Sequence, residues 1–208
     1  MHIEPGLISA VKVMGANIGA VSLLSYYGKS VITSPTQCLR SLLAAIFFSL
    51  FMQSFHLSVG PSELHFVGAM AMYLTLGFLP TLVGFAAGLL LQGVLFEPQD
   101  LPHLAVNSLS LIIPLITVHF VKRRLEWNAL NWQTIIKLDA IYYSGVAVMV
   151  GFWLSLADAA TPLAAWATWA ASYLAIVIIE PVVTLASVRL LQRYRDSKLV
   201  QICFAVSA

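Results

Sequence analysis

The first two residues of the chain, Met1 and His2, can together bind a transition metal ion. A free α-amine, the backbone amide nitrogen of His2 and its imidazole reach one ion by closing two adjacent chelate rings. These three nitrogens lie nearly in one plane, and a further imidazole would complete the square geometry that suits Ni(II) and Cu(II) and also holds low-spin Co(II). Methionine before a bulky residue is a poor target for removal, so we expect Met1 to keep its amine. Because the amide must lose its proton, binding is expected to weaken in acid.

His65 is the candidate for the fourth nitrogen. It can supply its imidazole if the loop before the third expected membrane span packs over the N-terminus. The other three histidines, His56, His103 and His119, are interpreted as interfacial side chains solvated by lipid headgroups. The predicted metal ligands are therefore Met1, His2 and His65.

Four further polar residues are candidates to support this site. A carboxylate inside a membrane span costs roughly 2.5–3.5 kcal/mol on insertion scales, so Glu180 is expected to face protein or water. It either orients ligands, contacts a partner subunit or makes a hydrogen bond inside the bundle. Asn107 and Gln92 are candidates to fix the orientation of an imidazole. Glu63 lies close to His65 in the sequence and either attracts cations or is a solvated loop acid.

The composition indicates which elements position these residues. Of the 208 residues, 60% are hydrophobic and only 10% are charged, and the mean hydropathy is +0.88. A soluble domain carries about a quarter charged residues, and so short a chain cannot hide this much apolar surface in one core. A lipid bilayer can surround this apolar surface, so that it need not be buried in a protein core. We therefore predict a single all-α transmembrane domain over residues 1–208.

Apolar runs long enough to cross a ~30 Å hydrocarbon core occur along the whole chain. The stretch 65–96 is too long for one span, and Gly77 and Pro80 near its middle are residues at which a helix breaks. Segments 55–64, 97–103 and 158–162 carry no Lys or Arg, whereas the remaining connections and the C-terminal tail are basic. If 65–96 crosses twice, every basic segment falls on one side, as the positive-inside rule favours.

The chain is thus expected to have about seven spans, with the N-terminus outside and the C-terminus in the cytoplasm of a plasma (inner) membrane. The predicted spans are 7–27, 39–58, 65–78, 80–96, 104–121, 135–157 and 163–191.

Several function classes lack a starting motif in this sequence. No nucleotide-binding pattern is present, so the chain is not expected to hydrolyse ATP by itself, and the zinc-hydrolase and serine-hydrolase signatures are also missing. The formal charge of +2 gives no indication of nucleic acid binding. Cys38 and Cys203 are far apart and predict neither a disulfide framework nor a thiolate site. The first residues have no basic region typical of a signal peptide, so we expect them to be retained.

The order of several short motifs resembles the CbiM/NikM family, the substrate-capturing membrane subunits of energy-coupling-factor importers for cobalt and nickel. The matching residues are Met1-His2-Ile3 with Gly6, the segment Gly60–Gly68 around His65, Gln92 and Phe96 followed by Asn107, and Glu180 followed by Thr184. The chain departs from the family pattern at five places: Pro61 replaces Thr, one extra residue precedes His65, Glu97–Asp100 replace a Gly-rich turn, Ser110 replaces a second Asn and Pro181 replaces Gly.

This resemblance implies that Met1, His2 and His65 bind the ion. It also implies partners: a transmembrane coupling subunit, two cytoplasmic ATPases and, in some systems, a small accessory membrane protein. The chain itself is expected to be a transport subunit without enzymatic activity or a resident cofactor, and Co(II) or Ni(II) is its cargo. The sequence does not choose between the two metals.

Two alternatives remain open. The chain can be a related capture subunit for another small solute, with Tyr26, Tyr73, Tyr142 and Tyr173 lining an aromatic cavity. It can also be a membrane-embedded enzyme that uses a His/Glu pair, although no second acid is expected inside the membrane beside Glu180.

Overall fold

A computed structural model of the chain describes residues 3, 6–59, 62–127, 130–158 and 162–205. The backbone is mostly helical, as a membrane interior requires, because helices satisfy their own backbone hydrogen bonds. The elements in chain order are α1 (Ala10–Ile32), α2 (Pro35–Ser54), β1 (His56–Val59), β2 (Ser62–His65), α3 (Ala69–Leu76), α4 (Phe78–Leu95), the 3-10 helix η1 (Pro98–His103), α5 (Leu104–Arg124), α6 (Trp132–Ser155), α7 (Leu163–Ser172), α8 (Leu174–Arg193) and α9 (Lys198–Cys203).

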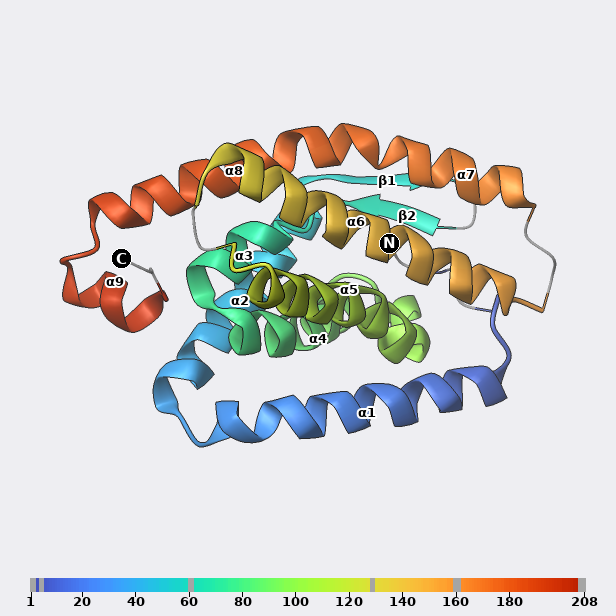
Figure 1. The fold of residues 1–208 in the computed structure, drawn as a ribbon. Helices are drawn as coiled ribbons and strands as arrows, with labels where there is room; N and C mark the ends of the chain where they lie inside the picture. The colour runs from blue at the N-terminus through green and yellow to red at the C-terminus, as the bar shows by residue number, and fades with distance from the viewer. Residues whose placement is uncertain (1–2, 4–5, 60–61, 128–129, 159–161, 206–208) are drawn as a thin grey trace.

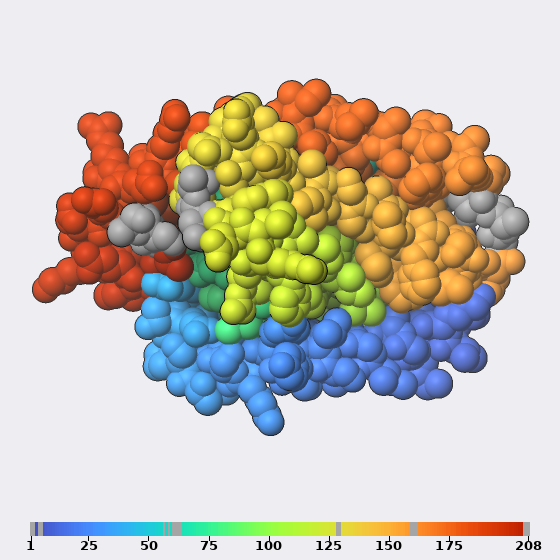
Figure 2. All heavy atoms as spheres, in the orientation of Figure 1, coloured from blue at the N-terminus to red at the C-terminus, as the bar shows by residue number. Residues whose placement is uncertain are grey.

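The long helices form one bundle around a central set of elements. In Figure 1, α1 runs along one side, α7 and α8 run along the opposite side, and α2 to α6 lie between them. Side chains of α1 meet those of the central helices on the face seen in Figure 2, and a cavity of about 500 Å³ lies between α1, α4 and the start of α5. The largest hydrophobic core joins α2, α3, α4, α5, α6 and α8, and a smaller core joins the N-terminal segment, α1 and α5.

The most extensive helix contact in the bundle is between α2 and α4. Gly84 and Gly88 face α2. A Cβ atom at position 84 would collide with Ala44, and one at position 88 would lie only 2.6 Å from Phe48 Cδ1. Small residues let helix backbones approach where lipid supplies no hydrophobic driving force. The glycines at 84 and 88 thus allow close packing of α4 against α2.

Residues 56–59 and 62–65 form a feature that the sequence did not predict, a pair of antiparallel strands. In its register, His56 stands opposite His65 and Leu57 opposite Leu64. The second expected span therefore ends early, at Ser54, and not at residue 58.

The third expected span is also shorter than predicted. Its helix, α3, holds only eight residues and ends at Gly77, whose φ of 97° favours glycine. A helix of this length rises about 12 Å at ~1.5 Å per residue, which is less than half of a hydrocarbon core. The predicted break between the third and fourth spans is confirmed at Gly77, and within 65–78 only residues 69–76 form the helix α3.

Five helices of the described chain are long and apolar enough to cross a membrane: Pro35–Ser54, Phe78–Leu95, Pro98–Arg124, Trp132–Ser155 and Leu163–Arg193. Two of the seven expected spans are not among them. One is α3, because it is short, and the other is α1, which has 23 residues but includes Lys12 and Lys29. The chain is a multi-pass membrane protein, and the count of seven crossings stays a prediction.

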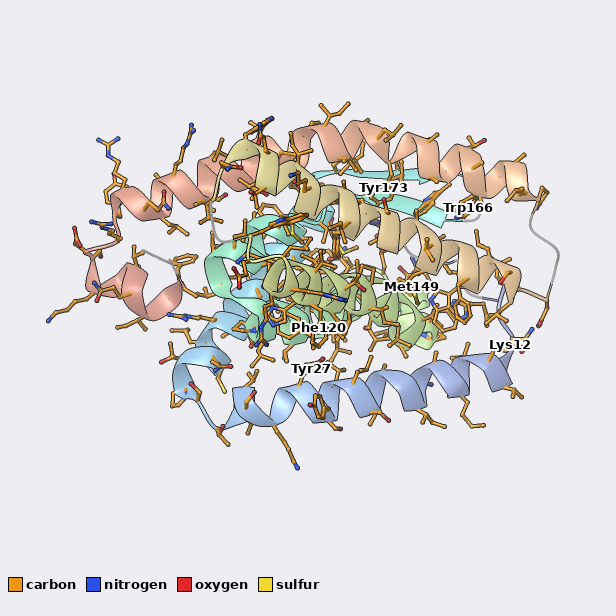
Figure 3. All side chains as sticks on the ribbon, viewed as in Figure 1. Lys12, Tyr27, Phe120, Met149, Trp166 and Tyr173 are labelled. Atoms are coloured by element: carbon orange, nitrogen blue, oxygen red, sulfur yellow. The ribbon has the colours of Figure 1, made fainter. Side chains whose placement is uncertain are left out.

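The two ends of the bundle differ in charge. The start of α1, the end of α6 and the start of α7 meet at one end, while the end of α8 and α9 lie at the other (Figure 1). The first group includes Asp158, and the second includes the basic residues Arg189 and Arg193 of α8. Lys12 is an exception at the first end, where its Nζ contacts Asp158 Oδ1 at 2.8 Å (Figure 3).

Candidate metal site

The N-terminal segment is anchored inside the bundle at Ile3. The predicted ligands Met1 and His2 lie outside the described residues, and Ile3 is the first residue that the structure describes. Its side chain is fully buried in the smaller core, and its backbone N–H donates to Asn107 Oδ1 at 3.2 Å. Its carbonyl oxygen lies 3.2 Å from His103 Nδ1. Both polar backbone atoms of this residue are therefore held by side chains.

The two side chains that hold Ile3 come from one stretch of the chain. The 3-10 helix η1 ends at His103, the residue that caps the start of α5. Asn107 follows four residues later, and side chains at this spacing lie on the same face of a helix. Asn107 thus lies against the N-terminal segment at Ile3.

His65 ends strand β2 and is 1% exposed. Its carbonyl oxygen accepts a hydrogen bond from the Tyr173 hydroxyl at 3.3 Å, and Tyr173 stands at the junction of α7 and α8 (Figure 3). A backbone hydrogen bond from a buried tyrosine therefore fixes the residue that would supply the fourth nitrogen. Glu63 precedes it in β2, and its side chain lies outside the described part of the structure.

Glu180 holds the segment that follows His65. Its carboxylate accepts from the backbone N–H of Met70 at 3.1 Å, and the N–H groups of Gly68 and Ala69 lie near it. These N–H groups start α3 and have no partner within their helix, and the positive end of a helix favours a carboxylate. The Tyr143 hydroxyl donates to the other oxygen. Of the interpretations of Glu180, the hydrogen bond inside the bundle is therefore present.

Gln92 is placed elsewhere. It is buried on α4, and its side-chain oxygen lies 3.4 Å from the Ser49 hydroxyl of α2. Among the candidate supporting residues, Asn107 thus lies against the N-terminal segment and Glu180 against the segment after His65. Within the described residues, no group of three or more His, Cys, Asp and Glu side chains is close enough to hold a metal ion.

A comparison with protein families decides what kind of protein carries this arrangement. The model of the family CbiM, described as the cobalt uptake substrate-specific transmembrane region, matches residues 2–197. The chain belongs to the CbiM family. No curated protein matches it.

Two solved structures share the CbiM-family fold of this chain. One is described as the crystal structure of a transition metal transporter, with a TM-score of 0.75, 22% identity and 96% of each chain covered. Another is described as a truncated transition metal transporter, with a TM-score of 0.74, 21% identity, and 93% of this chain and 99% of that chain covered. The arrangement of helices in this CbiM-family chain is therefore one that occurs in experimental structures.

Two histidines of this CbiM-family chain do not fit the expected solvated position. His103 is 3% exposed and contacts Ile3, so its interpretation as an interfacial histidine is wrong. His119 is half-buried, and its ring stacks on Phe78 with centroids 3.9 Å apart and lies within 3.2 Å of the Tyr73 hydroxyl. The side chain of His56 lies outside the described part of the structure. Nothing in the local sequence around His103 signals its burial, because the contact joins residues a hundred positions apart.

Asp139 is a buried acid that the sequence analysis missed. It is fully buried on α6, one turn before Tyr143, and neither carboxyl oxygen has a hydrogen-bond partner among the described residues. The expectation that no second acid accompanies Glu180 inside the membrane is therefore wrong. The sequence itself distinguishes this residue, because Asp139 is the only acidic residue in the apolar run 135–157.

Proposed function

We propose that this chain is the substrate-capturing subunit of an energy-coupling-factor importer for cobalt or nickel. The ion is bound by the amine of Met1, the amide nitrogen and imidazole of His2, and the imidazole of His65. Membership of a cobalt uptake family supports the cargo class. The observation that carries the proposed site is the anchoring of Ile3 by Asn107 and His103.

The anchored Ile3 limits where the proposed ligands can lie. Consecutive Cα atoms are ~3.8 Å apart, so the nitrogens of the first two residues stay close to Asn107 and His103. Binding an ion with a mobile chain end costs conformational entropy, of about 1–2 kcal/mol for each residue that becomes fixed. A chain already held at residue 3 leaves only two residues to order.

The fixed position of His65 supports the fourth ligand. Its backbone is tied to Tyr173, and the segment after it is tied to Glu180, so the imidazole projects from a constrained backbone. Preorganised ligands favour one coordination geometry over others. A planar set of four nitrogens is the geometry that we infer for the bound ion.

Transport through this subunit requires other proteins in our proposal. The ion is captured and dehydrated at the outer face, with the N-terminus outside, and is released towards the cytoplasm when partners change the conformation. Those partners are a transmembrane coupling subunit, two cytoplasmic ATPases and an optional accessory membrane protein. The sequence has no nucleotide-binding motif, and energy must therefore come from them.

The alternative of a different small solute finds no support in the tyrosines that suggested it. Tyr26 is 76% exposed on α1, whereas Tyr73, Tyr142 and Tyr173 are buried in the packed core. The alternative of a membrane enzyme gains a second acid in Asp139, yet the family is described by uptake and not by catalysis. Metal capture remains the function that the chain supports best.

The decisive experiment adds one residue at the N-terminus. A second methionine placed before Met1 moves the amine out of reach of the His2 chelate, and we expect tight Ni(II) and Co(II) binding to be lost in the purified protein. The matched control carries the added methionine at the C-terminus and should bind as the unmodified chain does. Equal binding by both extended proteins would contradict the proposed chelate.

A second pair of variants tests the fourth ligand. His65→Ala should weaken Ni(II) binding in calorimetric titration, while His119→Ala, which removes a half-buried imidazole outside the proposed site, should leave it unchanged. Unchanged affinity in His65→Ala would remove His65 from the site but leave the N-terminal chelate standing.

A further inference from the structure

The imidazole of His103 contacts the N-terminal segment and not the helix α5 that follows it. His103 occupies the N-cap position of α5, but its side chain makes no hydrogen bond to the first turn of that helix. Its Nδ1 instead lies 3.2 Å from the carbonyl oxygen of Ile3, a residue 100 positions earlier in the chain. Both residues are almost completely buried, with 3% and 0% of their surfaces exposed.

The carbonyl partner determines which ring nitrogen of His103 carries a proton. A carbonyl oxygen only accepts hydrogen bonds, so Nδ1 of His103 must carry the proton and donate it. Without that donor, the Ile3 carbonyl is a buried acceptor away from water, which is unfavourable. The imidazole thus satisfies the one polar atom of Ile3 that Asn107 does not reach, since Asn107 accepts from the N–H.

The two contacts act on opposite sides of one Cα atom. Asn107 holds the N–H of Ile3 and thereby the peptide that joins it to residue 2, while His103 holds the carbonyl and the peptide that leads away. Burial of the Ile3 side chain fixes the third substituent of this Cα atom. A residue held in this way has one backbone conformation, so the direction in which the chain end leaves it is set.

We propose that His103 is a positioning residue for the N-terminal chelate: it orders the chain end for a divalent transition metal ion that takes four nitrogens in a plane. This inference rests on the proposed function, because it requires that the ion bind to Met1 and His2. His103 acts through Ile3 and does not touch the ion in this proposal.

The hydrogen-bond geometry gives a sharp set of substitutions. In Asn, the Nδ2 amide occupies the place of the Nδ1 nitrogen of His, one bond beyond Cγ, so His103→Asn keeps a donor to Ile3. In Gln, the amide nitrogen is one bond further away and corresponds to Nε2, so His103→Gln misplaces the donor. His103→Leu removes it. Ser110→Ala is the matched control, because Ser110 is buried on the same helix but its hydroxyl bonds to Val106 of that helix at 2.9 Å.

Ni(II) affinity and the Ni(II) dissociation rate are measured for the purified full-length variants, together with the visible absorption of the planar Ni(II) complex. A buried acceptor left without its donor corresponds to about a tenfold loss of affinity. We expect this loss in His103→Leu and His103→Gln with faster dissociation, near-native values in His103→Asn, and native values in Ser110→Ala. The unfolding temperature is recorded in parallel, and the Asn and Gln variants keep the comparison valid even where the Leu variant does not fold.

Two results would overturn the role of His103. In one, Asn and Gln bind Ni(II) equally well; in the other, Ser110→Ala loses as much affinity as His103→Gln, which would indicate a general loss of packing. The protein with an added N-terminal methionine separates this inference from the proposed function. If that protein loses Ni(II) while His103→Gln does not, the chelate stands and the positioning role fails. If it binds Ni(II) normally, the proposed chelate itself fails.

Discussion

The carboxylate of Glu180 accepts a hydrogen bond from the backbone N–H of Met70, 110 positions earlier in the chain, at 3.1 Å. This contact joins α8 to the first turn of α3, the short helix that begins four residues after His65. Gly68, the residue before α3, has a left-handed φ of 64° and no side chain that could cap the helix. The cap therefore comes from a distant helix. A change in the position of α8 acts directly on the backbone that carries His65.

Replacing Glu180 should destabilise the protein because its oxygens satisfy buried N–H groups. Each buried donor left without a partner costs about 1–3 kcal/mol. We expect Glu180→Leu to lower the free energy of unfolding by several such increments, and Glu180→Gln, which keeps one amide oxygen, to lower it less. Thermal unfolding in detergent, followed by circular dichroism, measures both.

The control for Glu180 is Asp158→Asn at the bundle end. Its carboxylate is 54% exposed and contacts Lys12, so its loss should cost no more than about 1 kcal/mol. A loss in Glu180→Leu as small as in Asp158→Asn would contradict a structural role of Glu180 in capping α3.

Asp139 should respond in the opposite way to neutralisation. It is buried like Glu180, but no hydrogen bond to its carboxyl oxygens is found among the described residues. An uncompensated charge in such a place is unfavourable, and a neutral residue of similar shape should be tolerated or stabilising. We expect Asp139→Asn to match or exceed the native unfolding temperature. A clear decrease, as in Glu180→Leu, would show that the carboxyl group of Asp139 has a partner that stabilises the fold.

Much of this fold could be predicted from the sequence, because apolar length and glycine breaks are local properties. The break at Gly77 and the close contact of Gly84 and Gly88 with α2 both follow from residue types. The strands 56–59 and 62–65 could not, since each has only four residues, too few to be distinguished from the end of an apolar run. Residues 163–191 were expected as one span, whereas a turn at Tyr173 divides this segment into α7 and α8.

The sequence could suggest candidate ligands and the supporting residue Asn107, but not the other residues that hold the backbone of the candidate site. Asn107 was expected near the ligands, and it contacts Ile3. The roles of His103 and Tyr173 depend on contacts across about a hundred residues, which no local pattern carries. Asp139 was different, because a lone acid inside an apolar run is visible in the sequence itself.

The hydroxyl of Tyr173 should matter for metal affinity more than for stability. Tyr173→Phe keeps the ring packing against Trp169 and Tyr143 but removes the donor to the His65 carbonyl. One neutral hydrogen bond corresponds to about 0.5–1.5 kcal/mol, so we expect Ni(II) affinity to fall roughly 2- to 12-fold. Tyr194→Phe, at an exposed position at the end of α8, is the control and should bind normally. Native affinity in Tyr173→Phe would mean that the backbone of His65 needs no such support.

The two free cysteines of the chain offer a test of its orientation. Cys38 is exposed near the start of α2, and Cys203 ends α9, where the Arg40 side chain donates to the carbonyl oxygens of Gln201, Ile202 and Phe204. Both lie at the basic end of the bundle, which the positive-inside rule assigns to the cytoplasm. Asp158 lies at the opposite end, so a cysteine introduced there as the only thiol reports on the other face.

A thiol reagent that cannot cross the membrane should therefore label Asp158→Cys in intact cells but not Cys38 or Cys203. In inverted membrane vesicles the result should reverse, with Cys38 labelled and the cysteine at 158 protected. Labelling of Cys38 from outside would invert the orientation, and with it the face at which the ion is captured. Labelling of both ends from the same side would require an even number of crossings between residues 38 and 158, and the pairing of α3 with α4 as two crossings would then be wrong.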